Sequence, residues 1–155
     1  MIRVQETPFD PGEELAAIRG GDTAIGGVCS FVGLVRDMPA GSLSAMTLEH
    51  YPGMTERMLA DIDAEAHERW PLQASRVVHR HGRMEPGEPI VFVATASAHR
   101  KAAFESCEFL IDWLKTQAPF WKFEETAEGG RWVDARADDD DAARRWLRER
   151  DRAAE

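Results

Sequence analysis

The feature that most constrains the fold is the stretch 114–124, because a helix must end and a strand must begin within it. Apolar residues recur at helical spacing over 101–116, which predicts a helix with one buried side. The residues expected on that side are Ala103, Phe104, Cys107, Leu110, Ile111 and Leu114. Pro119 disfavours helix in the residue before it, so we expect the helix to end there and a strand to follow over 120–125.

Strands arrive mostly in pairs between single helices along the rest of the chain. We expect strands over 2–6, 24–36, 45–51, 74–81, 89–98 and 131–135, and helices over 11–19, 55–70 and 142–152. No Gly-rich turn feeds a helix, as dinucleotide binding would require. The sequence therefore predicts one α+β domain over residues 1–155, with a largely antiparallel sheet, packed helices and a frayed tail after about residue 150.

The overall charge limits the partners. The chain of 155 residues carries a formal net charge of -9 at pH 7. No nucleic acid and no anionic membrane is therefore expected as a partner of the whole molecule. Any bound anion needs a locally basic pocket instead. The longest apolar stretch, 90–98, is too short to span a bilayer.

The two cysteines, Cys29 and Cys107, lie far apart and lack the spacing of metal ligands. We interpret both as reduced, buried residues, which is typical of a cytoplasmic protein. The first residues lack the apolar run of a signal peptide. His79 and His81 alternate on a predicted strand without a nearby set of cysteines or carboxylates, so we interpret them as surface residues. No pattern indicates a metal or a cofactor.

Three basic residues stand where a strand ends or a helix begins. Arg36 ends the second predicted strand, which Gly26 and Gly33 interrupt with a bulge or a close backbone approach. An arginine there can clamp phosphate with two parallel hydrogen bonds. His99 and Arg100 open the strongest predicted helix, where free N–H groups and the helix dipole attract anions. Surface charge and simple capping account for the same residues equally well.

Lys115 and Lys122 lie on either side of Pro119. Each has an ordinary explanation, a cation at a helix C-terminus for Lys115 and a surface charge for Lys122. Brought together, two lysines disfavour each other's charged form, and burial beside Phe120 and Trp121 would add to this effect. A neutral lysine serves as a base or a nucleophile, so these residues are candidates for catalysis.

Seven short segments, taken together, resemble one protein family. They are 31–36, 47–54, 79–82, 87–88, 97–100, 114–124 and 130–133. Each segment alone is weak, but their order and spacing are specific. From about residue 23 to residue 146 the chain resembles the catalytic (large) subunits of molybdopterin synthase.

The resemblance implies an α/β hammerhead fold and a sulfurtransferase of molybdenum cofactor biosynthesis. Such an enzyme converts a cyclic pyranopterin monophosphate into molybdopterin by adding the two sulfurs of its dithiolene. The sulfur comes from a thiocarboxylate on the C-terminal glycine of a small ubiquitin-like carrier subunit. The large subunit forms a homodimer with one carrier at each end, which gives a heterotetramer. No cofactor is implied.

The resemblance also implies roles for individual residues. Lys115 and Lys122 match the catalytic lysines and lie at the substrate. The other implied substrate-binding positions are Leu34, Val35, Arg36, His99, Arg100, Phe123 and Glu124. We expect Phe120 and Trp121 to wall a groove for the carrier's tail. Many relatives carry a second basic residue where this chain has Phe123, so this pocket has one cation fewer.

Two functions remain open, the sulfurtransferase and a non-catalytic anion-binding or regulatory module with the same basic pocket. The lysine pair favours the enzyme, because anion binding alone needs no neutral lysine. Arg100 and Lys115 lie at opposite ends of the predicted helix, about 22 Å apart. We therefore expect two subunits to share each pocket, with the helix start of one chain facing the lysines and Arg36 of the other.

Overall fold

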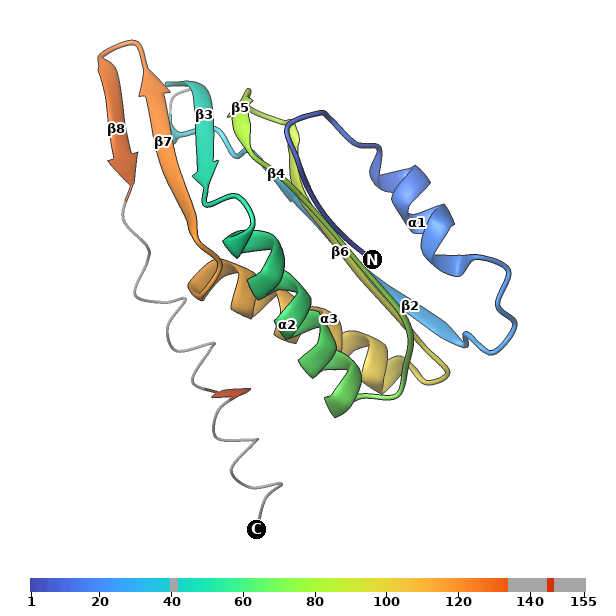
Figure 1. Cartoon of the computed structure of the whole chain (residues 1–155). Coiled ribbons are helices and arrows are strands. Elements are labelled where there is room, and N and C mark those ends of the chain that lie inside the picture. The colour runs from blue at the N-terminus through green and yellow to red at the C-terminus, as the bar shows by residue number, and fades with distance from the viewer. Residues whose placement is uncertain (40–41, 134–144, 147–155) are drawn as a thin grey trace.

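The structure, a computed structural model, describes residues 1–39, 42–133 and 145–146. Within these ranges the chain forms eight strands and three full helices, an α+β fold as predicted (Figure 1). The strands are β1 (Ile2–Gln5), β2 (Gly27–Leu34), β3 (Leu43–His50), β4 (Leu72–Arg80), β5 (Gly82–Met84), β6 (Pro89–Ser97), β7 (Phe120–Thr126) and β8 (Gly129–Val133). The helices are α1 (Pro11–Arg19), α2 (Met54–Arg69) and α3 (Arg100–Thr116).

The described strands form two four-stranded sheets, whereas the sequence suggested one. The first sheet has the order β1-β4-β6-β2 and the second the order β5-β3-β7-β8. Among the described residues β1 and β4 pair in parallel and the other pairs are antiparallel, so the largely antiparallel prediction is confirmed. β5 was not predicted. Gly82, at φ 81°, turns the chain out of β4 and into the second sheet, where β5 pairs with β3.

Helices cover both faces of the first sheet (Figure 1). On one face of β4, Val78 packs in a cluster with Ile18 of α1. The preceding residue, Val77, packs on the other face with residues of α2 and α3. Successive strand residues point to opposite faces, so each layer takes alternate side chains. Because both faces are covered, β6 is apolar almost throughout, which explains the long apolar run at 90–98.

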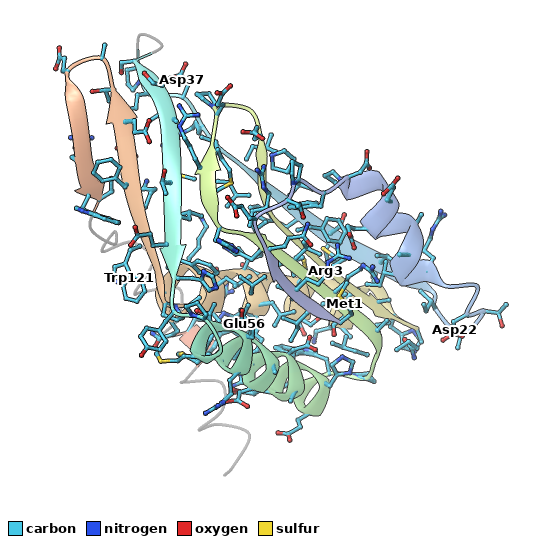
Figure 2. The ribbon with its side chains drawn as sticks, turned by 45° about the horizontal axis from the view of Figure 1, so that its top comes forward. Met1, Arg3, Asp22, Asp37, Glu56 and Trp121 are labelled. Carbon is cyan, nitrogen blue, oxygen red and sulfur yellow. The ribbon has the colours of Figure 1, made fainter. Side chains whose placement is uncertain are left out.

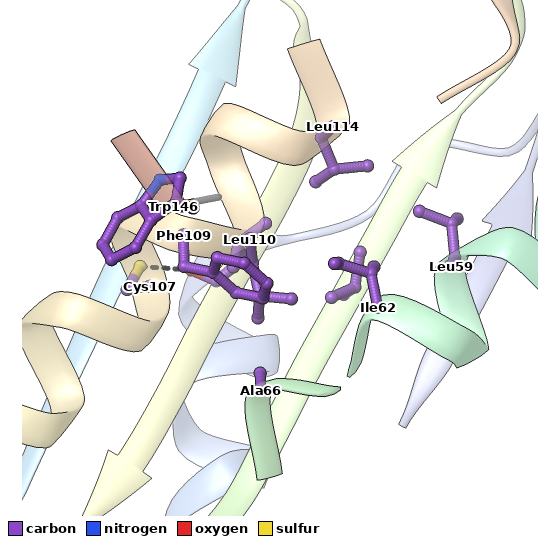
Figure 3. Packing of buried hydrophobic residues seen from close by; sticks show 10 residues of the cluster. Leu59, Ile62, Ala66, Cys107, Phe109, Leu110, Leu114 and Trp146 are labelled. Carbon is purple, nitrogen blue, oxygen red and sulfur yellow. Dashed lines mark hydrogen bonds between the residues drawn. The ribbon is translucent and has the colours of Figure 1, made fainter. Parts of the chain in front are cut away.

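The larger core lies between the first sheet and helices α2 and α3 (Figure 3). Its buried helical residues are Leu59, Ile62, Ala66, Cys107, Phe109, Leu110, Leu114 and Trp146. Trp146 is fixed there by its Nε1–H, which donates to Asp112 Oδ2 at 2.9 Å. The rest of the helix predicted over 142–152, apart from Arg145, lies outside the described residues, as do positions 134–135 of the last predicted strand.

Phe104 was predicted to be buried and this is wrong, because its side chain is 62% exposed. The inward line of α3 runs through Ala103, Cys107 and Leu110. One residue further along a helix turns the side chain by about 100°, which carries Phe104 out of that line. Cys107 is buried as predicted, whereas Cys29 is half-buried, and both thiols are free.

Two glycines in and beside β2 confirm the predicted irregularities. A Cβ added at Gly26 would lie 2.2 Å from the carbonyl oxygen of Ala98, so only glycine allows this close approach. The pairing register of β2 with β6 shifts between Gly33 and Leu34, as at a bulge. No helix among the described residues is long and apolar enough to cross a membrane.

Candidate active site

The two candidate lysines lie at the junction of α3 and β7. The Gln117 N–H donates to the Trp113 carbonyl at 2.8 Å and closes the last helical turn. Lys115 stands in that turn and Lys122 is the third residue of β7, so both occupy the predicted elements. The Lys115 side chain is exposed, and Lys122 is half-buried.

Lys122 has a carboxylate partner that sequence reasoning did not pair with it. Its Nζ lies 3.0 Å from Glu124 Oε1, and Arg131 reaches the other oxygen of Glu124 at 3.3 Å. Although burial raises the pKa of Glu124, the hydrogen bonds from Lys122 and Arg131 hold it below its usual value. Glu124 therefore stays ionised and holds the Lys122 ammonium in place.

Phe123 lies on the other face of β7 from Lys122, because neighbouring strand residues alternate. Its ring meets the Trp132 ring edge to face at 5.2 Å. A Cβ added at Gly130 would lie 2.2 Å from the Phe123 ring, so a side chain at that position would force the ring to move. The side chain of a basic residue in place of Phe123 would thus point to the face of β7 opposite Lys122.

The two aromatic residues that open β7 also point to opposite faces. The Phe120 ring stacks on His79, with centroids 3.8 Å apart and planes 14° apart. Trp121 turns outward and is 50% exposed. A groove walled by both rings stays a prediction, and Trp121 is the ring that solvent reaches more freely.

The surface assignment of His79 is wrong, since its side chain is only 7% exposed. The strand holding it, β4, has neighbours on both sides, and the first sheet is covered on both faces. Its Nδ1–H donates to the Arg80 carbonyl at 2.8 Å. Burial lowers the pKa of His79 to about 4, with smaller contributions from His50 and His81. His81 is half-buried, and its ring lies 4.4 Å from that of His50.

This group of three histidines, His50, His79 and His81, was missed as a unit. Its members come from the ends of β3 and β4 and the residue after β4, beside the start of β7. His50 pairs in register with Phe120 and lies 3.7 Å from Glu56. Strand pairing creates the group, and the sequence signals it only through the segments 47–54 and 79–82.

Arg36 follows Val35, the first residue after β2. Val35 is 2% exposed and packs in the core of the second sheet, whereas Leu34 and Arg36 are exposed. Asp37 Oδ1 then accepts from the backbone N–H of Leu43 at 3.2 Å, which ties the loop to the start of β3. The exposed Arg36 side chain therefore extends from a backbone that is anchored on both sides.

His99 and Arg100 are exposed at the start of α3, as predicted. His99 occupies the N-cap position, yet within the described residues its side chain makes no capping hydrogen bond. This counts against the simple capping explanation. It leaves the imidazole and the guanidinium at a helix N-terminus, a favourable place for an anion.

The structure does not bring these basic residues together within one chain. Arg100 and Lys115 are separated by α3, about 22 Å. Gly27 pairs with Ser97 and Leu34 with Pro89, so His99 and Arg36 lie near opposite ends of β2, about 24 Å apart. Arg36 and Lys122 also lie toward opposite ends of the second sheet, as Asp37 and Trp121 do in Figure 2.

The described residues offer two shallow hollows elsewhere. One, of about 780 Å³, lies between β1 and α1 and includes Arg3 and Glu14. The other, of about 690 Å³, lies beside Gly20 and Gly27. Neither contains a predicted site residue. In the part of the chain that the structure describes, no three His, Cys, Asp or Glu side chains are arranged so that they could bind a metal ion together.

Known proteins resemble this chain over nearly its whole length. A family model described as "MoaE protein" matches residues 4–117. A relative from Pseudomonas aeruginosa named molybdopterin synthase catalytic subunit is 59% identical, covering 94% of this chain and 97% of its own. A molybdopterin biosynthesis MoaE protein from Burkholderia ambifaria has a TM-score of 0.81 at 53% identity, covering 94% of this chain and 97% of that one. A complex of subunits 1 and 2 of molybdopterin-converting factor from Helicobacter pylori shares the fold, with a TM-score of 0.75 at 21% identity and coverage of 87% and 91%.

Proposed function

Because the chain belongs to the MoaE protein family, we propose that it is the catalytic subunit of a molybdopterin synthase. The enzyme is a sulfurtransferase that converts a cyclic pyranopterin monophosphate into the dithiolene molybdopterin. One observation carries the proposal, namely 59% identity to a catalytic subunit over 94% of this chain and 97% of that one. The match therefore covers nearly the full length of both chains.

The proposed chemistry requires two anions, a phosphate and a thiocarboxylate, to meet at one place on an acidic protein. Lys115, exposed at the end of α3, is the proposed catalytic residue for proton transfer and for handling the acyl group of the carrier. Lys122, held 3.0 Å from Glu124, assists by binding charge that develops on the substrate. Arg36, His99 and Arg100 are the proposed substrate-binding residues, because they supply positive charge locally.

The proposed sulfur donor is a small ubiquitin-like subunit that ends in a thiocarboxylated glycine. The name of the Pseudomonas aeruginosa relative, molybdopterin synthase catalytic subunit, supports the presence of a further subunit. A glycine tail has no side chains, so it needs backbone hydrogen bonds and flat apolar walls. The half-exposed Trp121, one residue before Lys122, offers such a wall at the junction of α3 and β7.

The separation of the basic residues supports a site shared by two chains. Within one chain α3 holds Arg100 about 22 Å from Lys115, too far for one small substrate to touch both. We propose a homodimer in which the start of α3 from one chain faces Lys115 and Lys122 of the other, inside a heterotetramer with two carriers. The edge strand β2 exposes apolar side chains, as an association surface does. They are Phe31, Val32 and Leu34.

We propose that the protein acts in the cytoplasm, whichever of the two functions it has. The alternative function is an anion-binding module without catalysis. Reconstitution separates the two. The chain is mixed with the pyranopterin and a thiocarboxylated carrier, and dithiolene formation is measured against the same carrier ending in an ordinary carboxylate. The enzyme consumes two thiocarboxylates for each dithiolene formed. Binding of both partners without any dithiolene would leave the anion-binding module as the function.

A further inference from the structure

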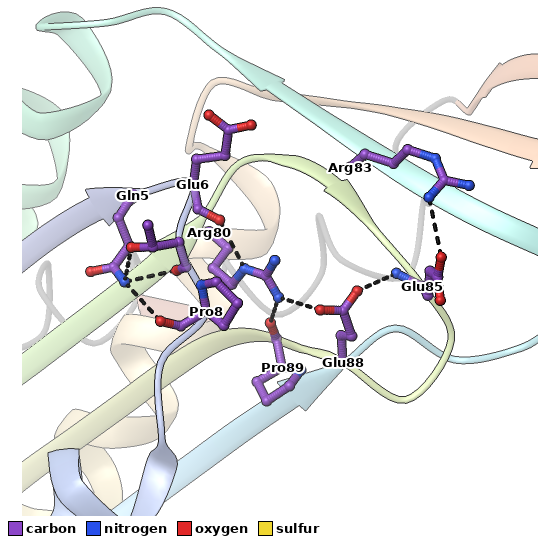
Figure 4. Close-up of polar contacts among 9 residues, drawn as sticks. Gln5, Glu6, Pro8, Arg80, Arg83, Glu85, Glu88 and Pro89 are labelled. Atoms are coloured by element: carbon purple, nitrogen blue, oxygen red, sulfur yellow. Dashed lines mark hydrogen bonds and ion pairs between the residues drawn. The ribbon is translucent and has the colours of Figure 1, made fainter.

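A buried arginine with no assigned role is connected through one turn to the backbone beside the proposed substrate arginine. Arg80, the last residue of β4, is only 4% exposed. Its guanidinium donates to the Glu6 carbonyl at 3.3 Å, to the Pro89 carbonyl at 3.2 Å and to Glu88 Oε1 at 3.1 Å (Figure 4). Burial of a charge costs free energy unless partners surround it, and an apolar side chain of similar size often serves stability equally well. The arrangement is therefore better suited to fixing a geometry than to adding stability.

The geometry that Arg80 fixes is the turn Glu85–Glu88 between β5 and β6. Glu88 uses both carboxylate oxygens, Oε1 for Arg80 and Oε2 for the backbone N–H of Glu85 at 2.6 Å. The Glu85 N–H and the Arg80 guanidinium hold the pKa of Glu88 below its usual value, so the carboxylate is ionised at neutral pH. One side chain thus closes the turn and anchors it to β4.

The same turn also holds the backbone of Val35, the residue before Arg36. The Val35 N–H donates to the Glu88 carbonyl at 2.9 Å, and the Gly87 N–H donates to the Val35 carbonyl at 2.8 Å. Both backbone polar groups of Val35 are therefore bonded to the turn, and Arg36 is the next residue.

We propose that Arg80 and Glu88 are positioning residues for Arg36. They hold the turn Glu85–Glu88, the turn holds Val35, and Val35 sets the point and the direction in which the Arg36 side chain leaves the backbone. The ligand affected is the anion that Arg36 binds, so this inference rests on the substrate-binding role given to Arg36 above. Fixing the backbone that carries a guanidinium reduces the entropy lost when the guanidinium binds a phosphate.

The test uses Glu88→Gln, because the Glu88 side chain is 37% exposed and its replacement leaves no buried cavity. The amide removes the charge and can accept only one of the two hydrogen bonds. Hydrogen exchange at the Val35 amide should become faster. The KM for the pyranopterin should rise by roughly fivefold, with a smaller change in kcat. Arg83→Gln is the matched control, since it removes an exposed ion pair to Glu85 of the same turn and one to Glu125 of β7, and it should change neither quantity.

A double-mutant comparison separates positioning of Arg36 from a general structural effect. In an Arg36→Ala chain, Glu88→Gln should raise KM no further, because its effect passes through Arg36. An equal rise in both backgrounds, or unchanged exchange at Val35, would overturn the positioning role. If Arg36→Ala alone leaves KM unchanged, the substrate-binding role of Arg36 is what fails, and the exchange rate at Val35 still decides whether Glu88 holds the turn.

Discussion

Acidification should destabilise this protein through His79. The native pKa of His79 is about 4, against an ordinary value of 6.5, because the ring is buried. In the unfolded chain the imidazole takes up a proton below about pH 6.5, whereas the native state resists protonation until about pH 4. The His79 contribution to stability is therefore complete above about pH 6.5 and is lost as the pH falls toward 4. For these two pKa values the loss between about pH 7.5 and about pH 5 is about 2 kcal/mol.

Urea unfolding at a fixed protein concentration measures this loss at each pH. His79→Phe keeps a ring to stack on Phe120, and His79→Asn keeps an N–H donor for the Arg80 carbonyl. Neither variant titrates at this position. Both should be less stable than the wild type at pH 7.5, and both should lose about 2 kcal/mol less than the wild type between pH 7.5 and pH 5. Equal losses in the wild type and both variants would show that His79 has the same pKa in the native and unfolded states, which would refute the reasoning.

The remaining predictions concern the proposed site. Lys122→Ala should lower the rate of dithiolene formation while carrier binding, measured by calorimetry, stays nearly intact; loss of the carrier with the chemistry retained would make Lys122 a docking residue. Mixing Arg100→Ala chains with Lys115→Ala chains should restore up to about half of the activity per dimer, because both lesions fall in one shared pocket and the other pocket is intact. No recovery after proven subunit exchange would mean that each site is built within a single chain.

Local patterns predicted most of the secondary structure, because helical spacing and turn residues act over short distances. The helix predicted over 55–70 formed as α2, with bounds that differ by one residue at each end. The break at Pro119 correctly separated α3 from β7. The division into two sheets was missed, since it depends on Gly82 turning the short strand β5 toward β3, a partner more than thirty residues earlier in the chain.

The sequence predicted which elements hold the candidate site residues, but not how those residues are paired and buried. Lys115 and Lys122 lie in the expected elements, but the ion pair of Lys122 with Glu124 needs the strand geometry that places alternate residues on one face. His79 looked like a surface residue because its strand alternates, but the strands on both sides of β4, the covered faces of the first sheet and the stacked Phe120 ring bury it. Such layers are assembled from distant segments, and no local pattern reports them.

The measurement that tests the account most directly is single-turnover dithiolene formation by Lys115→Ala. The chain offers a matched control in Lys101→Ala, an exposed lysine of the same helix that pairs with Glu105 at 3.7 Å. With pyranopterin and thiocarboxylated carrier in excess, the Lys115 variant should be slower by roughly a hundredfold or more, the scale for losing one preorganised polar group. The Lys101 variant should match the wild type. A folded Lys115→Ala chain that forms the dithiolene at a near-normal rate would contradict the central claim.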